Sequence, residues 1–183
     1  MLFQQPMNRA IIIHGWEGTP EGHWKPWLKN EIEKKGWKTE IPQMPETMHP
    51  KFDQWLSHLT NIIGKPDKNL FLIGHSLGGT IILRYLETID KKIGGAVLVA
   101  AAIESPQPEV QSFFKTSFDW PKIKANCQKF VAINSDNDYF IPIEQGKTLE
   151  KNLDAELIIM KNMGHFSSKE NLKELPIILE VLK

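Results

Sequence analysis

The feature that most constrains the fold is the alternation of short, continuous apolar runs with amphipathic stretches along all 183 residues. Continuous apolar runs are typical of strands buried on both faces, as in parallel sheets. Apolar residues spaced three to four positions apart are typical of helices that cover such a sheet. The expected strands span residues 10–13, 37–41, 70–73, 96–101, 130–133 and 157–160. The second of these alternates more than the others and fits an edge strand.

Helices are expected between these strands. One begins near Trp27 and ends at Gly36, and the others span residues 52–63, 77–89 and 172–182. Strand–helix alternation of this kind produces a parallel sheet with helices on both faces. We therefore predict a three-layer α/β fold, with about six parallel strands in the order 2-1-3-4-5-6 and one domain over residues 1–183. The first crossover should run on one face and the later crossovers on the other.

The segment 104–126 interrupts the alternation. It contains three prolines and four aromatic residues, which are Phe113, Phe114, Phe118 and Trp120. It follows the fourth strand, at the sheet edge where α/β folds place their sites. We therefore expect a flap of loop and short helix there, with Phe113, Phe114 and Phe118 lining a substrate pocket.

The charge balance argues against a nucleic-acid partner. Lys plus Arg and Asp plus Glu each number 22, whereas nucleic-acid binding normally needs a basic excess. No apolar run approaches the roughly 18 residues that span a bilayer, and the first residues lack the pattern of a signal peptide. Cys127 is the only cysteine, so no disulfide can form within the chain. We expect a cytoplasmic monomer without membrane or nucleic-acid partners.

A serine nucleophile is indicated by the run Gly74-His75-Ser76-Leu77-Gly78, which fits G-x-S-x-G. In this pattern a sharp turn from strand to helix exposes the serine hydroxyl, and the glycines leave room for the turn. The helix N-terminus below the serine favours developing negative charge. A glycine-rich turn without function is the alternative. Because an expected strand precedes the run and an expected helix follows it, we predict that Ser76 is the nucleophile.

The general base and its acid are sought downstream, because this arrangement follows the order Ser, acid, His. His165 is the only histidine after Ser76, and it lies in the turn that leaves the expected last strand. Asp136 and Asp138 both follow the fifth strand. Asp138 is favoured, because D-x-x-[VI]-P is the usual pattern there and the residue must clear the strand end. Asp136 would then be a turn former.

Two backbone N–H groups are needed to stabilise an oxyanion. The residue after the nucleophile, Leu77, supplies one, and the loop after the first strand supplies the other. In that loop Gly15 permits a close backbone approach, so Trp16 N–H is the expected second donor. Trp16 and Phe166 are also expected to line the substrate pocket.

Several of these motifs occur together in one known family. The chain contains His14-Gly15-Trp16-Glu17-Gly18, His23-Trp24-Lys25-Pro26-Trp27, the run 74–79, D-x-x-I-P at Asp138 and Gly164-His165-Phe166. It resembles, over nearly its whole length, the small serine hydrolases related to YdeN and to retinoblastoma-binding protein 9. The resemblance implies a compact α/β-hydrolase core without a cap domain. It also implies a triad of Ser76, Asp138 and His165, and no cofactor.

The expected activity is hydrolysis of a small, apolar carboxylic ester, because the flap is aromatic and no basic cluster suggests an anionic substrate. Metal or nucleotide chemistry is not expected, since H-E-x-x-H, a cysteine pair, a Walker A loop and G-x-G-x-x-G are all missing from the sequence. Amide cleavage and a catalytically idle protein-binding module are the alternatives. Binding to retinoblastoma protein would require L-x-C-x-E, but Ala125 and Lys129 occupy the outer positions around Cys127.

Overall fold

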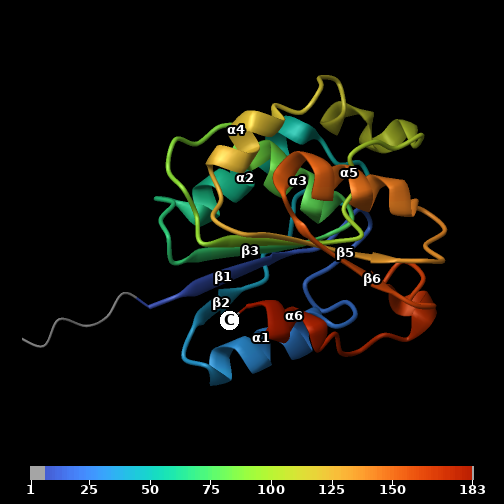
Figure 1. The fold of residues 1–183 in the computed structure, drawn as a ribbon, viewed down its shortest axis with the longest axis horizontal. Coiled ribbons are helices and arrows are strands. Elements are labelled where there is room, and N and C mark those ends of the chain that lie inside the picture. Colours follow the sequence, from blue (N-terminus) through green and yellow to red (C-terminus); the bar gives the residue numbers. More distant parts are fainter. Residues whose placement is uncertain (1–6, 183) are drawn as a thin grey trace, which may run out of the picture.

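Six parallel strands form one sheet in the computed structural model, which describes residues 7–182 (Figure 1). The strands are β1 (Arg9–Ile13), β2 (Lys38–Glu40), β3 (Leu70–His75), β4 (Gly95–Val99), β5 (Phe130–Ser135) and β6 (Glu156–Met160). Their order is β2-β1-β3-β4-β5-β6, and every neighbouring pair is parallel. This confirms the predicted order and the predicted edge position of the second strand. Residues 1–6, which entered the expectation of no signal peptide, lie outside the described residues.

Helices cover both faces of the sheet (Figure 1). One face carries α1 (Lys25–Lys34) and the C-terminal α6 (Ile177–Val181), which contact each other. The opposite face carries α2 (Phe52–Ile63), α3 (Leu77–Leu86), α4 (Trp120–Ala125) and α5 (Ile143–Leu153). The first crossover therefore runs on one face and the later crossovers on the other, as predicted. Within residues 7–182 no helix is long and apolar enough to cross a membrane.

The continuous apolar runs occur because each central strand contributes side chains to the hydrophobic cores on both faces of the sheet. Successive side chains of a strand point to opposite faces, so a strand covered on both sides needs apolar residues at every position. In β1, Ile11 and Ile13 join the core under α2 and α3, whereas Ala10 and Ile12 join the core under α1 and α6. All four are at most 3% exposed. Burial on this scale is the main stabilising contribution to the fold.

The segment 104–126 consists of a short 3₁₀ helix, η1 (Pro108–Phe113), a loop and α4. Arg84 of α3 fastens it, because the buried guanidinium donates to the carbonyl oxygens of Phe113 (3.0 Å) and Thr116 (2.6 Å). The same guanidinium pairs with Glu87 at 3.1 Å and lies 3.8 Å from the centre of the Phe118 ring. The predicted loop and short helix are present. Through these contacts, Arg84 holds residues 113–118 against α3.

The last helix is shorter than predicted. The apolar pattern suggested residues 172–182, but α6 begins at Ile177. Asn171 adopts a left-handed conformation (φ 53°), and Pro176 stands at the N-cap. Since proline has no N–H to donate and restricts the residue before it, it begins a helix more readily than it continues one.

Lys25, at the start of α1, is a buried cation. Its side chain is 0% exposed, and among residues 7–182 its Nζ finds no hydrogen-bond partner. The ring of Trp24 lies 5.6 Å from Nζ. Burial lowers the pKa of Lys25 to about 8, because the low-dielectric interior disfavours the charged amine.

Replacing Lys25 with methionine is therefore expected to stabilise the protein at pH 7 by about 2 kcal/mol. The pKa of Lys25 in the folded protein lies below the unfolded value of 10.5. The free-energy cost of burying the charged amine is therefore complete below pH 8 and decreases as the pH rises to 10.5. Urea unfolding at pH 7 and pH 10 measures this difference. The matched control is Lys29→Met, because Lys29 is partly exposed and paired with Glu33 at 2.6 Å. A less stable Lys25→Met protein at pH 7 would contradict the prediction.

Candidate active site

Ser76 occupies the turn between the end of β3 and the start of α3. Its backbone is strained, with φ 54° and ψ −120°. Only glycine fits two residues before and two residues after Ser76, because a side chain there would clash. A Cβ at Gly74 would lie 2.5 Å from the backbone of Gly78. A Cβ at Gly78 would collide with the carbonyl of Ile13 at the end of β1. The turn therefore places Ser76 above the carboxyl end of the sheet.

His165 and Asp138 lie on the loops that leave β6 and β5. His165 Nδ1 is 2.9 Å and 3.1 Å from the two carboxylate oxygens of Asp138. A carboxylate only accepts, so Nδ1–H donates and Nε2 remains an acceptor in the neutral imidazole. The Asp138 side chain is 0% exposed and that of His165 10%. Within the described residues no hydrogen bond joins Ser76 Oγ to His165, as is common in catalytic sites before substrate binds.

Asp138 is fixed by its own turn. Its Oδ1 accepts hydrogen bonds from Phe140 N at 2.8 Å and Ile141 N at 3.0 Å. The turn points the carboxylate inward at His165 and leaves the next two aromatic side chains at the surface. These two backbone donors also compensate the burial of the negative charge.

The loop that carries His165 is held by the side chains that precede Asp138. Three consecutive amides of this loop each donate to a different side chain. The pairs are Asn162 N with Asp136 Oδ1 (2.8 Å), Met163 N with Ser135 Oγ (2.9 Å) and Gly164 N with Asn137 Oδ1 (2.9 Å). Asp136 was expected only to form a turn, but its carboxylate also contacts the His165 loop. The run Ser135–Asp138 thus holds four successive residues, 162–165.

His75 holds the same loop from the side of the sheet. Its Nε2–H donates to the carbonyl oxygen of His165 at 2.7 Å, and the two rings lie 4.9 Å apart. Burial lowers the pKa of His75 well below its ordinary value, and the neighbouring His165 lowers it further. His75 is therefore a neutral donor, and its hydrogen bond ties the backbone of His165 to the residue before Ser76.

The loop after β1 approaches Ser76 closely. A Cβ at Gly15 would lie 3.0 Å from Ser76 Cβ, which explains the glycine. Trp16 N–H and Leu77 N–H, the two expected oxyanion donors, make no hydrogen bond within the part of the chain that the structure describes. His14 is buried, donates from Nδ1 to Gly15 O at 2.9 Å and accepts from Met44 N at 3.0 Å, so it holds this loop in place.

A cavity of about 170 Å³ opens beside Ser76. No charged side chain lines it. Its walls are Trp16, Ser76, Leu77, Ala102, Ser105, Pro106, Gln107, Val110, Phe114, Tyr139, Phe140 and Ile141. Trp16 and Phe114, both expected in the pocket, are among these residues.

Phe113, Phe118 and Phe166, also expected in the pocket, lie elsewhere. Phe113 is 1% exposed and packs edge-on against Trp55 of α2, with ring centres 5.5 Å apart. Phe118 covers the Arg84 guanidinium on the outer side of α3. Phe166 is 0% exposed in the core under α1 and α6, where its carbonyl accepts from Trp24 Nε1 at 3.2 Å. Packing explains these differences, because Phe113 and Phe166 are buried in the two cores and Phe118 packs against Arg84.

Three residues that line the cavity were not identified from the sequence, and these are Tyr139, Phe140 and Ile141. The signal for them was present in the D-x-x-I-P pattern. Since the turn buries the Asp138 carboxylate against His165, the residues that follow Asp138 in the chain also lie near His165.

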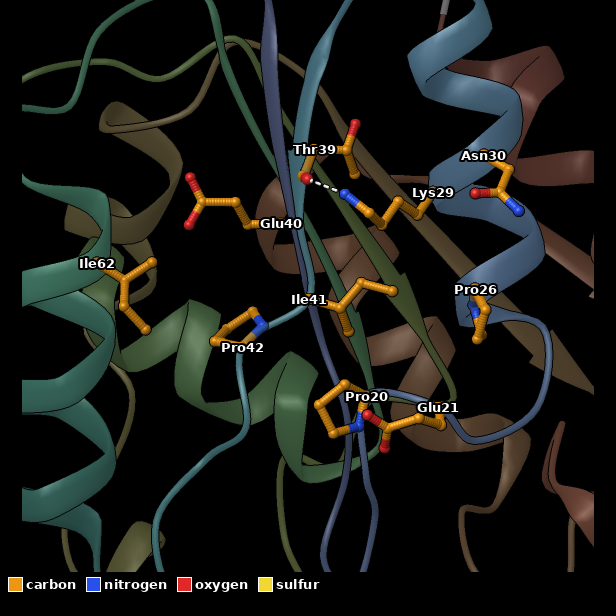
Figure 2. Close-up of a pocket in the computed structure, with 10 residues that line it drawn as sticks. All are labelled: Pro20, Glu21, Pro26, Lys29, Asn30, Thr39, Glu40, Ile41, Pro42 and Ile62. Atoms are coloured by element: carbon orange, nitrogen blue, oxygen red, sulfur yellow. Dashed lines mark hydrogen bonds between the residues drawn. The ribbon is translucent and has the colours of Figure 1, made fainter.

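A wider concavity, about 580 Å³, lies away from Ser76, beside the edge strand β2 (Figure 2). It is lined by Pro20, Glu21, Pro26, Lys29, Asn30, Thr39, Glu40, Ile41, Pro42 and Ile62. The amine of Lys29 already donates to Thr39 O at 2.5 Å and pairs with Glu33. The lining of this concavity includes no serine, cysteine or histidine, so the smaller cavity at Ser76 is the candidate active site.

The chain matches the serine hydrolase family over residues 10–183. It belongs to that family. YdeN of Bacillus subtilis (strain 168) is 35% identical over 180 residues, which cover 96% of this chain and 94% of YdeN. The serine hydrolase RBBP9 of Rattus norvegicus is 27% identical over 164 residues, which cover 87% of this chain and 82% of RBBP9.

Solved structures of this family and of other hydrolases share the fold. The crystal structure of the ydeN gene product superimposes with a TM-score of 0.90 at 33% identity, over 96% of this chain and 97% of that one. Est1E from Butyrivibrio proteoclasticus, solved with ferulic acid, gives a TM-score of 0.74 at 13% identity, over 96% and 90%. The latter similarity concerns the fold alone. The fold is that of the α/β hydrolases.

Three histidines near the site are expected to make the protein acid-sensitive. Burial lowers the pKa of His14, of His75 and of His23, the last to about 4. The unfolded chain takes up these protons near pH 6.5, whereas the folded protein does so only below its lowered pKa values. The free energy of unfolding should therefore fall as the pH is lowered from 6.5 towards 4.

Urea unfolding at half-unit pH steps measures this slope. His23→Gln should flatten it, whereas His49→Gln, a change at an exposed histidine, should leave it unchanged. A protein equally stable at pH 6.5 and pH 4.5 would contradict the prediction.

Proposed function

We propose that this protein is a carboxylesterase-like serine hydrolase that cleaves small, apolar carboxylic esters through an acyl-enzyme on Ser76. The observation that carries the proposal is the strained Ser76 turn, which opens into an uncharged cavity beside two backbone N–H groups without acceptors in the described residues. Asp138 and His165 lie at hydrogen-bond distance from each other on the adjoining loops.

In the acylation step, Ser76 Oγ attacks the ester carbonyl while His165 Nε2 takes its proton. The carbonyl oxygen becomes an oxyanion between Trp16 N–H and Leu77 N–H. Asp138 keeps the proton on Nδ1 and stabilises the imidazolium through its carboxylate. The bond from the carbonyl carbon to the alcohol oxygen then breaks, and His165 gives its proton to the departing alcohol.

In the deacylation step, His165 takes a proton from water, whose oxygen attacks the acyl-enzyme. The tetrahedral intermediate collapses, Ser76 recovers its proton from His165, and the acid leaves. Both steps use the same oxyanion donors. A catalytic cycle of this kind requires no cofactor.

The cavity favours a short, neutral acyl group. Its inner walls are formed by Leu77, Ala102, Val110 and Ile141, which are at most 5% exposed. A charged acyl group would lose its hydration there without gaining a partner. The volume of about 170 Å³ restricts its length.

The test is turnover of a p-nitrophenyl ester series, from acetate to decanoate, against p-nitroanilides with the same acyl groups. We expect ester hydrolysis that is fastest for short chains, slow or undetectable anilide hydrolysis, and loss of both in Ser76→Ala. Turnover of the anilides alone would assign an amidase instead. A folded protein that turns over neither series would favour the idle binding module.

A further inference from the structure

We propose that Tyr139 and Phe140 form a leaving-group subsite, which binds the aromatic alcohol portion of the ester. This inference rests on the proposed function and adds the substrate class on the alcohol side. Both residues directly follow Asp138 in the chain, and both line the cavity beside Ser76.

The chemistry fixes the side on which the alcohol must lie. In the tetrahedral intermediate the oxyanion points to Trp16 N–H and Leu77 N–H, and the new bond joins Ser76 Oγ. The alcohol oxygen must lie within reach of His165, because His165 donates the proton that releases it. The acyl group takes the remaining direction, into the buried part of the cavity.

Two aromatic residues of the cavity wall, Phe140 and Tyr139, lie beside His165. The Phe140 ring centre lies 5.1 Å from that of His165 at an interplanar angle of 76°, and the Tyr139 ring centre lies 6.1 Å away. The two aromatic rings are 4.7 Å apart. In the proposed subsite, an alcohol that receives its proton from His165 therefore lies next to this pair.

The pair is exposed and also held in place. Phe140 is 55% exposed and Tyr139 45%, so part of each residue is accessible to a ligand. Phe140 N donates to Asp138 Oδ1, the Tyr139 hydroxyl lies 3.2 Å from Ser167 Oγ, and Lys169 Nζ lies 4.2 Å from the Tyr139 ring centre. A fixed aromatic surface loses little entropy when a flat ring stacks on it.

The two ends of the site therefore differ in what they select. The inner walls are buried and restrict the size of the acyl group, whereas the aromatic pair opens to solvent and sets no limit on the size of the alcohol. Aromatic contact, rather than size exclusion, should determine preference on this side.

The test compares benzyl butyrate with ethyl butyrate, which share the acyl group and have alkyl alcohols without a conjugated leaving oxygen. We expect wild type to have the higher kcat/KM for the benzyl ester. Phe140→Ala should lower the benzyl-to-ethyl ratio of kcat/KM by about 3- to 10-fold. Both esters form the same butyryl-enzyme, so the rate of deacylation is the same for both. A difference in kcat/KM between them therefore arises before the acyl-enzyme forms.

The control variant is Phe114→Ala, which changes a cavity wall outside the aromatic pair and should change kcat/KM for both esters by the same factor. The rate at which a fluorophosphonate labels Ser76 shows that each variant is folded and active. An unchanged benzyl-to-ethyl ratio in Phe140→Ala, with ester turnover intact in wild type, would overturn the subsite alone. Failure of wild type to hydrolyse either ester, or to be labelled, would overturn the proposed function on which the subsite rests.

Discussion

Ser76→Ala and His165→Ala are each expected to lower kcat for ester hydrolysis on the order of 10⁵-fold, and the double variant should lose little more. In the proposed mechanism the two groups act in one step, because the hydroxyl is a weak nucleophile until the imidazole takes its proton. Once the hydroxyl or the imidazole is removed, the remaining group no longer contributes to the rate. Steady-state kinetics with a short p-nitrophenyl ester measure the three losses.

The matched control for this series is Ser105→Ala, since Ser105 is a second serine in the same cavity. This variant should retain activity within about 10-fold of wild type, as it removes no group that takes part in the proton transfer. Losses that multiply in the Ser76/His165 double variant would contradict the shared step.

Asp138→Asn is expected to lower kcat on the order of 10⁴-fold while the fold is retained. An amide at this position can donate to Nδ1, which favours the imidazole tautomer that carries its proton on Nε2. That tautomer cannot accept the proton of Ser76. The same kinetic assay, together with the circular dichroism spectrum and melting temperature, separates lost orientation from lost folding.

Asp136→Asn should cost less than about 10-fold in the same assay. Asparagine keeps a side-chain oxygen at the position where Asp136 Oδ1 accepts from Asn162 N at 2.8 Å. Asp136 accepts from the backbone of Asn162 instead, and the carboxylate at hydrogen-bond distance from His165 Nδ1 is that of Asp138. If Asp136→Asn proved the more damaging change, the acid role would pass to Asp136.

The fold could be predicted because burial on two faces leaves a direct mark on the sequence. The runs in β1, β3 and β4 lack polar alternation. For a given strand order, right-handed crossovers then decide on which face of the sheet each connection runs. Strand ends were less certain. β3 continues through Gly74 to His75, because its backbone pairs with β4 up to the Ser76 turn.

The pocket could be predicted only in part. Phe113, Phe114 and Phe118 have the same local pattern, but only Phe114 lines the cavity. Which ring faces the cavity depends on where Arg84 and Trp55 lie, and those residues are distant in sequence. Hydrophobic periodicity shows that a side chain is buried, not which partner buries it.

The loop contacts around His165 could not be predicted from the sequence either. The run Ser135–Asp138 reads as turn residues, which is what their composition favours. Its pairing with residues 162–165 joins loops that follow two different strands, and it appears only when β5 and β6 lie side by side. Side chains that bond to a distant backbone have no local signature.

The most direct test of the account is covalent labelling with a fluorophosphonate, followed by intact mass measurement and peptide mapping. The account predicts one adduct per chain on Ser76 in wild type, no adduct in Ser76→Ala, and slower labelling in His165→Ala. A folded wild-type protein that takes up no label, or an adduct on a residue other than Ser76, would contradict the claim that Ser76 is an activated nucleophile.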